Sequence, residues 1–336
     1  MANLSITADC NLRCRYCFAR GSHRAAAAGD GPDAGMTVHR FRRLLDLLQR
    51  SGVTEARLVG GEPTLHPQFT ALIDTVRDAG LKAVVFSNGL MPESALRCLT
   101  AVPADQVAVL VNALSPGHPR ARDQQATLRR LGARATLGFN IDNATPVLGF
   151  LVERIVTLGL SPTLRLGLAH PVFGGANRYL HPRDYPTVGE RILDLIGQAT
   201  PAGVQIRCDC GFVPCMFPPG SAALLGLARD DLGHCGPIPD LLPDGSAIPC
   251  FPLARFRLAA DDAGEVHAWR TRLRAALTPY RSLGLYRRCA ACPERAAGRC
   301  SGGCLAAALR RLQAPSVLPL GDSPGFATVI DPENLR

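Results

Sequence analysis

Lysine is almost absent from this chain, because Lys82 is the only lysine among its 37 lysines and arginines. The arginines are scattered, singly or in short pairs, and they form no basic run of the kind that contacts nucleic acid. The formal net charge of +9 therefore indicates a solvated, arginine-rich surface. A nucleic-acid partner is therefore the less favoured interpretation.

Long apolar runs and a targeting segment are also lacking. No stretch of about 18 uncharged apolar residues occurs, so we expect no membrane span. Residues 1–10 have neither the basic start nor the apolar centre of a secretory signal, which predicts a cytoplasmic protein. Apolar residues still make up 47% of the chain and charged residues 19%, which excludes wholesale disorder, collagen and coiled coil.

Strand-like and helix-like segments alternate through the first 200 residues. The strand candidates are short, apolar and bounded by Gly, Pro, Asn or Asp: residues 4–7, 55–59, 83–87, 106–111, 134–140 and 163–169. Amphipathic patterns lie between them, such as a helix that Thr37 caps and one from about Arg183 to Gln198. This alternation predicts an α/β fold, a partial (β/α)6 TIM-like barrel over residues 1–200, with its chemistry at the C-terminal ends of the strands.

The composition changes after residue 200. Residues 201–314 are rich in Cys, Gly and Pro and have little helical periodicity, so they cannot build a large apolar core. We expect a small Cys-rich iron–sulfur domain that metal centres hold together. Asp244-Gly245 predicts a hairpin within it. Residues 315–336 form a short tail rich in Pro and Gly.

Thirteen cysteines in a chain without a secretion signal predict metal or iron–sulfur ligation rather than disulfides. Cys10, Cys14 and Cys17 directly follow the first strand in the spacing C-x3-C-x2-C, with Tyr16 before the last cysteine. A structural zinc site takes four ligands, whereas three thiolates on a four-iron cluster leave one iron open for chemistry. An iron–sulfur cluster is therefore the first hypothesis, and zinc is the alternative.

Two further motifs end the second and third strands. They are Gly60, Gly61, Glu62 and Pro63 after the second strand and Ser87, Asn88 and Gly89 after the third. Paired glycines let a ligand approach the backbone closely, and a Glu can accept hydrogen bonds from an ammonium group. Together with the cysteine loop, these motifs resemble the radical S-adenosylmethionine (SAM) superfamily. In that superfamily the GGEP segment binds the amino group of the methionine, and the end of the third strand contacts the ribose.

The resemblance implies cofactors and a chemistry. Cys10, Cys14 and Cys17 would hold a 4Fe-4S cluster whose open iron binds SAM, and Tyr16 and Asn140 would also contact the cofactor. Reductive cleavage of SAM would yield methionine and a 5′-deoxyadenosyl radical, which abstracts a substrate hydrogen. A flavodoxin- or ferredoxin-type protein would supply the electron.

The later cysteines resemble the SPASM extension of the same superfamily, which carries one or two auxiliary 4Fe-4S clusters. They follow the pattern C-x9-G-x4-C and then C-x2-C-x7-C-x3-C: Cys235, Cys250, Cys289, Cys292, Cys300 and Cys304. The family usually has five residues where this chain has seven, and the last cysteine of the family pattern is absent. A second auxiliary cluster therefore needs a ligand from elsewhere or keeps an open iron.

The segment after residue 204 offers that ligand. Residues 208–304 hold nine cysteines, one more than two full clusters need. Cys208, Cys210 and Cys215 follow a short strand candidate, and Gly211 shapes a loop that could bring Cys215 beside Cys210. We expect Cys210 and Cys215 to be ligands and Cys208 to be spare. A single auxiliary cluster, or zinc, remains an alternative.

Asp209 and Cys208 are the candidates for the remaining chemistry. Many SPASM dehydrogenases place a base beside the auxiliary cluster, and Asp209 lies between two cysteines at the expected domain junction. A turn-capping role is the alternative for this Asp. Epimerases of the superfamily use a cysteine as hydrogen donor, which Cys208 could be. Phe251 stands where sulfatase-maturing members have an Asp, which argues against that activity.

The resemblance to SPASM proteins favours modification of a ribosomally made peptide by oxidation, cross-linking or epimerisation. Because the first strand candidate starts so early in the chain, a separate protein would have to recognise a leader peptide. A dehydrogenase or epimerase that acts on a small molecule, such as a sugar or aminocyclitol, is the second hypothesis. RNA modification and a non-catalytic iron–sulfur carrier are further alternatives.

Overall fold

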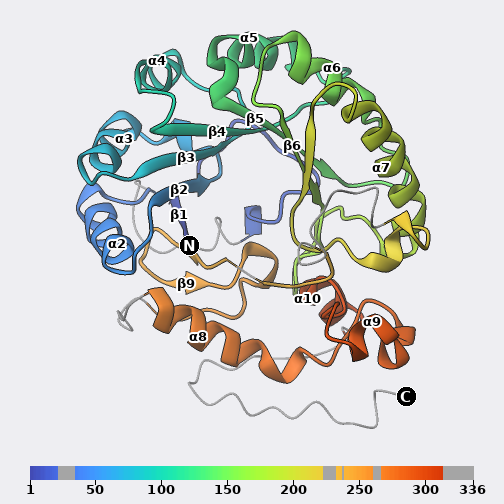
Figure 1. Cartoon of the computed structure of the whole chain (residues 1–336). Helices are drawn as coiled ribbons and strands as arrows, with labels where there is room; N and C mark the ends of the chain where they lie inside the picture. Colours follow the sequence, from blue (N-terminus) through green and yellow to red (C-terminus); the bar gives the residue numbers. More distant parts are fainter. Residues whose placement is uncertain (22–34, 222–231, 237, 260–265, 313–336) are drawn as a thin grey trace.

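The computed structural model describes residues 1–21, 35–221, 232–236, 238–259 and 266–312. Seven parallel strands follow one another in chain order across its central sheet: β1 (Asn3–Thr7), β2 (Glu55–Gly60), β3 (Lys82–Ser87), β4 (Val107–Asn112), β5 (Ala135–Ile141), β6 (Thr163–Leu168) and β7 (Gln205–Cys208). Helices cover the outer side of this sheet (Figure 1): α2 (Val38–Arg50), α3 (Phe69–Asp78), α4 (Glu93–Ala101), α5 (Ala121–Leu131), α6 (Gly149–Thr157) and α7 (Tyr185–Ala199). The predicted α/β partial barrel is confirmed. The predicted tail, residues 315–336, lies outside the described residues.

Local sequence accounts for the helix boundaries. The Thr37 hydroxyl accepts a hydrogen bond from the backbone N–H of Arg40 (3.3 Å), so the predicted cap of α2 is confirmed. Phe41 and Leu48 lie on the buried face of this helix. The last helix of the barrel begins at Tyr185, two residues later than the pattern predicts, because a separate 3-10 turn occupies the residues before it.

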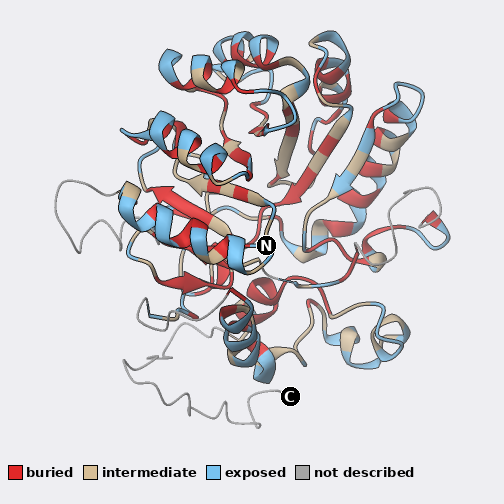
Figure 2. Ribbon diagram, turned by 60° about the vertical axis from the view of Figure 1, so that its left-hand side comes forward, coloured by how far each residue is buried: buried red, intermediate tan, exposed pale blue. Residues whose placement is uncertain are grey.

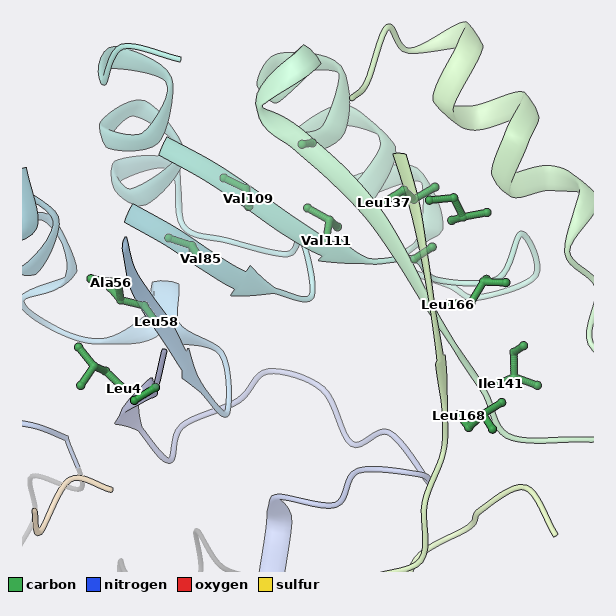
Figure 3. Packing of buried hydrophobic residues seen from close by; sticks show 14 of the residues in the cluster. Leu4, Ala56, Leu58, Val85, Val109, Val111, Leu137, Ile141, Leu166 and Leu168 are labelled. Carbon is green, nitrogen blue, oxygen red and sulfur yellow. The ribbon is translucent and has the colours of Figure 1, made fainter. Parts of the chain in front are cut away.

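Apolar strand residues form the core between the sheet and the helices. Leu58, Val85, Val109 and Leu137 are fully buried, and Figure 3 shows them on successive strands. In Figure 2 the helices are buried toward the sheet and exposed on the opposite side. In β4 every second residue is buried, which is the period expected of a strand with two different faces.

The other face of the strands encloses a polar interior. The guanidinium of Arg165 on β6 lies 5.6 Å from the ring centre of Phe86 on β3, and that of Arg57 on β2 lies 5.9 Å from it. Since β3 and β6 are not neighbours in the sheet, the contact between them crosses the concave side. The sheet is therefore curved into a partial barrel with arginines inside it.

The cysteine-rich region continues the same sheet. The strand β8 (Asp240–Leu241) pairs in parallel with β1, and β9 (Ala247–Ile248) pairs with β8 in the opposite direction. Gly245 has φ +86° in the turn between them, so the predicted hairpin is confirmed. Beyond it lie α8 (Val266–Leu277), α9 (Pro293–Ala296) and α10 (Leu305–Arg310), below the barrel in Figure 1. None of the described helices combines the length and hydrophobicity that a membrane crossing requires.

Candidate active site

The loop after β1 carries the first three cysteines at the C-terminal edge of the sheet. Burial raises the pKa of Cys14, and the thiols of Cys17 and Cys10 raise it further, so the three sulfur atoms lie within electrostatic reach of one another. The backbone N–H of Cys17 donates to the carbonyl of Cys14 (3.2 Å), and that of Leu12 donates to the Cys10 Sγ (3.5 Å). One short loop thus presents three thiols together.

The Gly-Gly pair after β2 packs against the start of this cysteine loop. The Gly61 N–H donates to the carbonyl of Thr7 (2.9 Å), and the Glu62 N–H donates to that of Asp9 (2.6 Å). A Cβ on Gly61 would lie 2.2 Å from the Asp9 carbonyl oxygen, and one on Gly60 would lie 2.4 Å from that of Thr7. In this structure the paired glycines therefore admit the backbone of the cysteine loop, which couples the two motifs.

Glu62 ties the end of β2 to the end of β3. Its side chain is fully buried, and its Oε1 accepts from the hydroxyls of Thr64 (2.6 Å) and Ser87 (2.9 Å). Its Oε2 accepts from the backbone N–H of Asn88 (2.6 Å). Burial raises the pKa of Glu62, whereas these hydrogen bonds lower it. Pro63 starts the 3-10 turn that carries Thr64 back toward the carboxylate.

Asn88 and Gln124 extend this network on both sides. The Asn88 Nδ2 donates to the Oδ1 of Asn11 (2.8 Å) and lies 3.9 Å from the Cys10 Sγ. The side chain of Gln124 on α5 is fully buried, and its Nε2 donates to the carbonyls of Asn88 (2.7 Å) and Asn112 (2.9 Å). The sequence analysis missed Gln124. The sequence signal that could have identified Gln124 is a polar residue on the apolar face of an amphipathic helix.

Tyr16 reaches from the cysteine loop to the ends of β4 and β5. The Asn112 Nδ2 donates to the Tyr16 hydroxyl (2.6 Å), and the Asn140 Nδ2 donates to the Asn112 Oδ1 (3.2 Å). Burial raises the pKa of Tyr16 above its ordinary range, so the phenol stays protonated. The structure brings together Tyr16 and Asn140, both predicted, and adds Asn112. Asn112 is the last residue of β4, and Asn140 is the last but one of β5. A polar residue at the C-terminal end of a strand is the sequence signal that could have identified Asn112 as a site residue.

Asp209 follows β7 and lies on the concave side of the barrel. It forms an ion pair with Arg165 of β6, and 41% of its side chain is exposed. Gly167 lies between two of the predicted residues, because a Cβ there would be 2.4 Å from the Asn140 Oδ1 and 3.5 Å from the Asp209 Oδ2. Asp209 and Asn140 therefore belong to the same polar site. Cys208 instead packs against the hydrophobic core.

Comparison with known proteins agrees with this arrangement. Residues 4–144 match the Radical SAM superfamily. Residues 4–144 therefore form a radical SAM domain. The matched residues span the strands whose ends carry the cysteine loop, the Gly-Gly turn, Asn88, Asn112 and Asn140. The superfamily that the sequence motifs resembled is thereby confirmed.

Two curated relatives share part of their length with this radical SAM protein. An S-adenosylmethionine-dependent nucleotide dehydratase from Selenomonas ruminantium is 29% identical over 177 residues, which are 49% of this chain and 54% of the relative. A GTP 3′,8-cyclase from Aeromonas hydrophila subsp. hydrophila is 36% identical over 86 residues, which are 25% of each chain. The matches thus span about half of the first relative and a quarter of the second.

A solved structure shares the fold across both halves of the chain. SuiB of Streptococcus suis bound to the precursor peptide SuiA has a TM-score of 0.62 at 15% identity, and the likeness covers 90% of this chain and 70% of that one. SuiB bound to S-adenosylmethionine gives the same TM-score and covers 90% of this chain and 72% of that one. A likeness over 90% of the chain extends past residue 200, so the shared fold includes cysteine-rich residues.

A radical SAM domain implies a 4Fe-4S cluster and SAM, and the residues at this loop fit them. Cys10, Cys14 and Cys17 are thiols rather than disulfides, and an amide of Asn88 lies beside one of them. In the part of the chain that the structure describes, no three His, Cys, Asp or Glu side chains converge on a point where they would hold a single metal ion. A four-iron cluster binds each thiolate through a different iron, so its ligands surround a volume.

Four of the later cysteines form a group that we name the inner quartet: Cys210, Cys235, Cys250 and Cys304. Burial raises the pKa of Cys250 well above its usual range, and the thiols of the other three raise it further. Burial raises the pKa of Cys304 to about 11. Burial, and then Cys304, raises the pKa of Cys235. Each of these thiols therefore lies within electrostatic reach of the others.

The remaining four cysteines form the outer quartet: Cys215, Cys289, Cys292 and Cys300. Burial raises the pKa of Cys215, the guanidinium of Arg288 lowers it, and the thiols of Cys289 and Cys300 raise it. Burial raises the pKa of Cys300, and the thiols of Cys289 and Cys292 raise it further. Cys215 thus lies beside the cysteines of the C-x2-C-x7-C segment. Its role as a ligand stays a prediction.

Backbone contacts hold the 210–215 segment beside both quartets. The Gly233 N–H donates to the carbonyl of Phe212 (2.7 Å), and the Ser301 hydroxyl donates to the carbonyl of Gly233 (2.9 Å). The Cys235 N–H in turn donates to the Ser301 Oγ (3.0 Å). These hydrogen bonds join three segments that are distant in sequence, and each segment contributes cysteines.

His170 packs between the barrel and the inner quartet. It is buried, and its Nε2 lies 3.1 Å from the carbonyl oxygen of Cys210. A Cβ on Gly211, which has φ +101°, would lie 2.2 Å from the His170 Cε1, so only glycine fits there. The imidazole therefore fixes the loop that carries Cys210.

Proposed function

We propose that this radical SAM enzyme cleaves SAM reductively and abstracts a hydrogen atom from a ribosomally made peptide. The observation that carries the proposal is the fold shared with SuiB in its complex with a precursor peptide, which extends over 90% of this chain. The outcome would be oxidation, a cross-link or epimerisation of the peptide. A flavodoxin- or ferredoxin-type protein would be the reductant.

The residues at the C-terminal edge of β1 to β5 would hold the cofactors. When bound, the 4Fe-4S cluster supplies the electron that cleaves SAM to methionine and the 5′-deoxyadenosyl radical. Cys10, Cys14 and Cys17 would hold this cluster. The Tyr16 phenol and the amide of Asn140 would orient the adenosine, since Tyr16 belongs to the cysteine loop and Asn112 links its hydroxyl to Asn140. Such preorganised donors position a reactant without reorganisation.

The GGEP and Ser87-Asn88 segments would form the methionine and ribose sides of the SAM site. Protein donors already surround the carboxylate of Glu62, so its buried network holds the turn in shape. Backbone groups of Gly60, Gly61 and Pro63 and the side chains of Ser87 and Asn88 would then face the cofactor. The direct contact between Glu62 and the ammonium group stays a prediction.

Each cysteine quartet offers the four thiols that a fully ligated 4Fe-4S cluster requires. We therefore propose two auxiliary clusters, with Cys210 in the inner quartet and Cys215 in the outer one completing the family pattern. Cys215 would replace the cysteine that is missing after Cys304. In an oxidation, a cluster held by the inner quartet would accept the electron that the substrate loses. His170, which follows β6, contacts the carbonyl of Cys210 and so links this quartet to the barrel.

Asp209 would accept the proton that the substrate loses as it is oxidised. Its carboxylate lies on the concave side, half-exposed and beside Asn140, where a substrate can reach it. The guanidinium of Arg165 holds it there through their ion pair. Cys208 packs toward the hydrophobic core, so of the two predicted catalytic residues we favour Asp209. Hydrogen donation by Cys208 stays a prediction.

A small-molecule substrate is the second candidate function. The observation that favours it is the similarity to a nucleotide dehydratase and a GTP cyclase, both of which act on nucleotides by their names. A nucleotide is therefore the first small molecule to test, followed by the sugars and aminocyclitols that the SPASM resemblance suggested.

One assay separates these candidates. The reconstituted enzyme is incubated anaerobically with SAM and dithionite, and 5′-deoxyadenosine is measured with precursor peptides encoded near its gene, with GTP and CTP, and with aminocyclitols. We expect stimulation by a peptide, together with a mass change of that peptide. Stimulation by nucleotides or aminocyclitols alone would contradict the peptide substrate, and no SAM cleavage at all would contradict the radical chemistry.

A further inference from the structure

A groove of about 460 Å³ runs between the loop after β6 and the C-terminal elements of the chain. We name it the arginine groove, because its walls include Arg183 from the loop, Arg287 beside the cysteine-rich turn, and Arg310 and Arg311 at the end of α10. Tyr179 and Tyr286 form its sides. A hollow of about 380 Å³ adjoins it and adds Arg288.

The groove concentrates positive charge. No Asp or Glu is among the described residues that line either hollow. The Arg183 side chain is 78% exposed and forms an ion pair with Asp184 (Nε to Oδ1, 3.7 Å), which does not line the groove. A cleft lined by charges of one sign attracts ligands of the opposite sign. The charge of the groove therefore suits an anionic ligand.

Two of the arginines are held ready for a ligand. The Arg310 Nη1 donates to the carbonyl of Gly175 (2.8 Å), and the Arg311 Nη1 donates to that of Gly284 (2.8 Å). Each guanidinium thus donates one N–H group to a backbone carbonyl of the protein, and its other N–H groups can donate to a ligand. A fixed guanidinium binds a carboxylate or a phosphate with two parallel hydrogen bonds at little entropic cost.

The aromatic residues favour a peptide over a nucleic acid. The Arg310 guanidinium lies 5.6 Å from the ring centre of Tyr179, and His181 stacks with the same ring at 6.4 Å. The Arg288 guanidinium lies 4.6 Å from the ring centre of Tyr286, whose hydroxyl donates to a backbone carbonyl. Single-stranded nucleic acid binds by stacking its bases on open aromatic faces. Here a guanidinium already lies over each of these two rings.

We propose that the arginine groove binds an acidic segment of the peptide substrate, with Asp or Glu carboxylates on its arginines. This inference rests on the peptide substrate proposed above and names the part of the peptide that is recognised away from the reacting residue. The loop that forms one wall starts at the C-terminal end of β6, next to the catalytic edge of the barrel. A segment bound in the groove would therefore hold the rest of the peptide close to that edge.

The test measures binding without turnover. A fluorescein-labelled octapeptide with four Glu and two Leu is titrated with the anaerobically reconstituted full-length enzyme, without SAM, and anisotropy is followed. The matched peptide has four Gln in place of Glu, and octathymidylate is the nucleic-acid probe. The variant R183Q/R287Q removes two exposed groove arginines. The control R122Q/R129Q removes the same charge from exposed positions on α5, on the opposite side of the molecule in Figure 1.

We expect the acidic peptide to bind more tightly than its Gln counterpart and than octathymidylate. R183Q/R287Q should weaken that binding about tenfold, since two charge pairs are lost, and R122Q/R129Q should not. Equal loss in both variants, no preference for the acidic peptide, or tighter binding of octathymidylate would overturn the proposal. Formation of 5′-deoxyadenosine by the same preparation tests the radical chemistry separately, so failure of the groove and failure of the proposed function give different results.

Discussion

Asp240 gives this protein a pH-dependent stability that can be worked out from its surroundings. It lies in β8 beside Asn3 of β1, is 4% exposed, and accepts a hydrogen bond from the Asn3 Nδ2 (2.8 Å). The Oδ1 of Asn3 is buried and has no hydrogen-bond partner among the described residues. A protonated Asp240 can donate to that oxygen and so satisfy both side chains. Burial raises the pKa of Asp240 to about 7.

The sign of the effect follows from where the proton is bound. Between pH 4 and 7 the folded state keeps the proton on Asp240, whereas the unfolded chain releases it at its ordinary pKa of 3.8. The free energy of unfolding therefore falls as pH rises through this range, by about 1.4 kcal/mol per pH unit, and levels off above pH 7. From pH 5.5 to pH 8 the loss from this one group is about 2 kcal/mol.

The substitution D240N removes the titration and keeps the shape. An Asn at this position can still accept from the Asn3 Nδ2 and can donate to its Oδ1. A chain of this length has an unfolding entropy of about 0.7 kcal/mol per kelvin, so 2 kcal/mol corresponds to about 3 °C in Tm. The Tm of D240N minus that of the native protein should therefore rise by about 3 °C from pH 5.5 to pH 8.

The assay is anaerobic thermal unfolding of the reconstituted protein, followed by circular dichroism at a single scan rate. D78N, which neutralises an exposed carboxylate on α3, is the matched control. A Tm difference for D240N that stays constant between pH 5.5 and pH 8 would show that Asp240 titrates as an ordinary carboxyl. In that case the argument from burial and from the unpartnered Asn3 oxygen would be wrong.

Three other substitutions test the site. C215A should lower the iron content by up to four atoms per chain, with 5′-deoxyadenosine still formed; an unchanged iron content would refute the outer quartet. G61A should displace the cysteine loop and abolish SAM cleavage, because its Cβ would lie 2.2 Å from the Asp9 carbonyl, and undiminished cleavage would contradict this. Q124A should lower stability by about 2 kcal/mol, because two partly buried carbonyls lose their donor. Chemical denaturation measures it, with Q125A, at a partly exposed position on the same helix, as control.

Local patterns in the sequence were enough for the barrel and for the order of its motifs. Strands of four to seven residues alternate with amphipathic helices, and parallel strands place their C-terminal ends on one edge of a sheet. Motifs that end the first three strands must then lie next to one another. For this reason the sequence alone places the cysteine loop, the Gly-Gly turn and the Ser87-Asn88 turn in one site.

Contacts between distant segments were decided only by the tertiary structure. Three such contacts join residues more than ten positions apart. They are the hydrogen bond from Gln124 to the Asn88 carbonyl, the packing of Thr7 and Asp9 on the paired glycines, and the ion pair between Arg165 and Asp209. Residue spacing along the chain carries no information about such approaches. The arginine groove likewise gathers arginines from three segments, each of which has an ordinary charge density by itself.

The cysteines show most clearly what the sequence determined and what the tertiary structure decided. Their number and the absence of a secretion signal pointed to metal centres, because thiols in such a chain are seldom paired. Which thiol lies beside which could not be read from spacing, since loop geometry over residues 208–304 decides it. The sequence by itself determined that this chain carries a radical SAM domain and extra thiols. The folded backbone divides eight of them into two quartets, because hydrogen bonds of Gly233 and Ser301 bring three distant segments together.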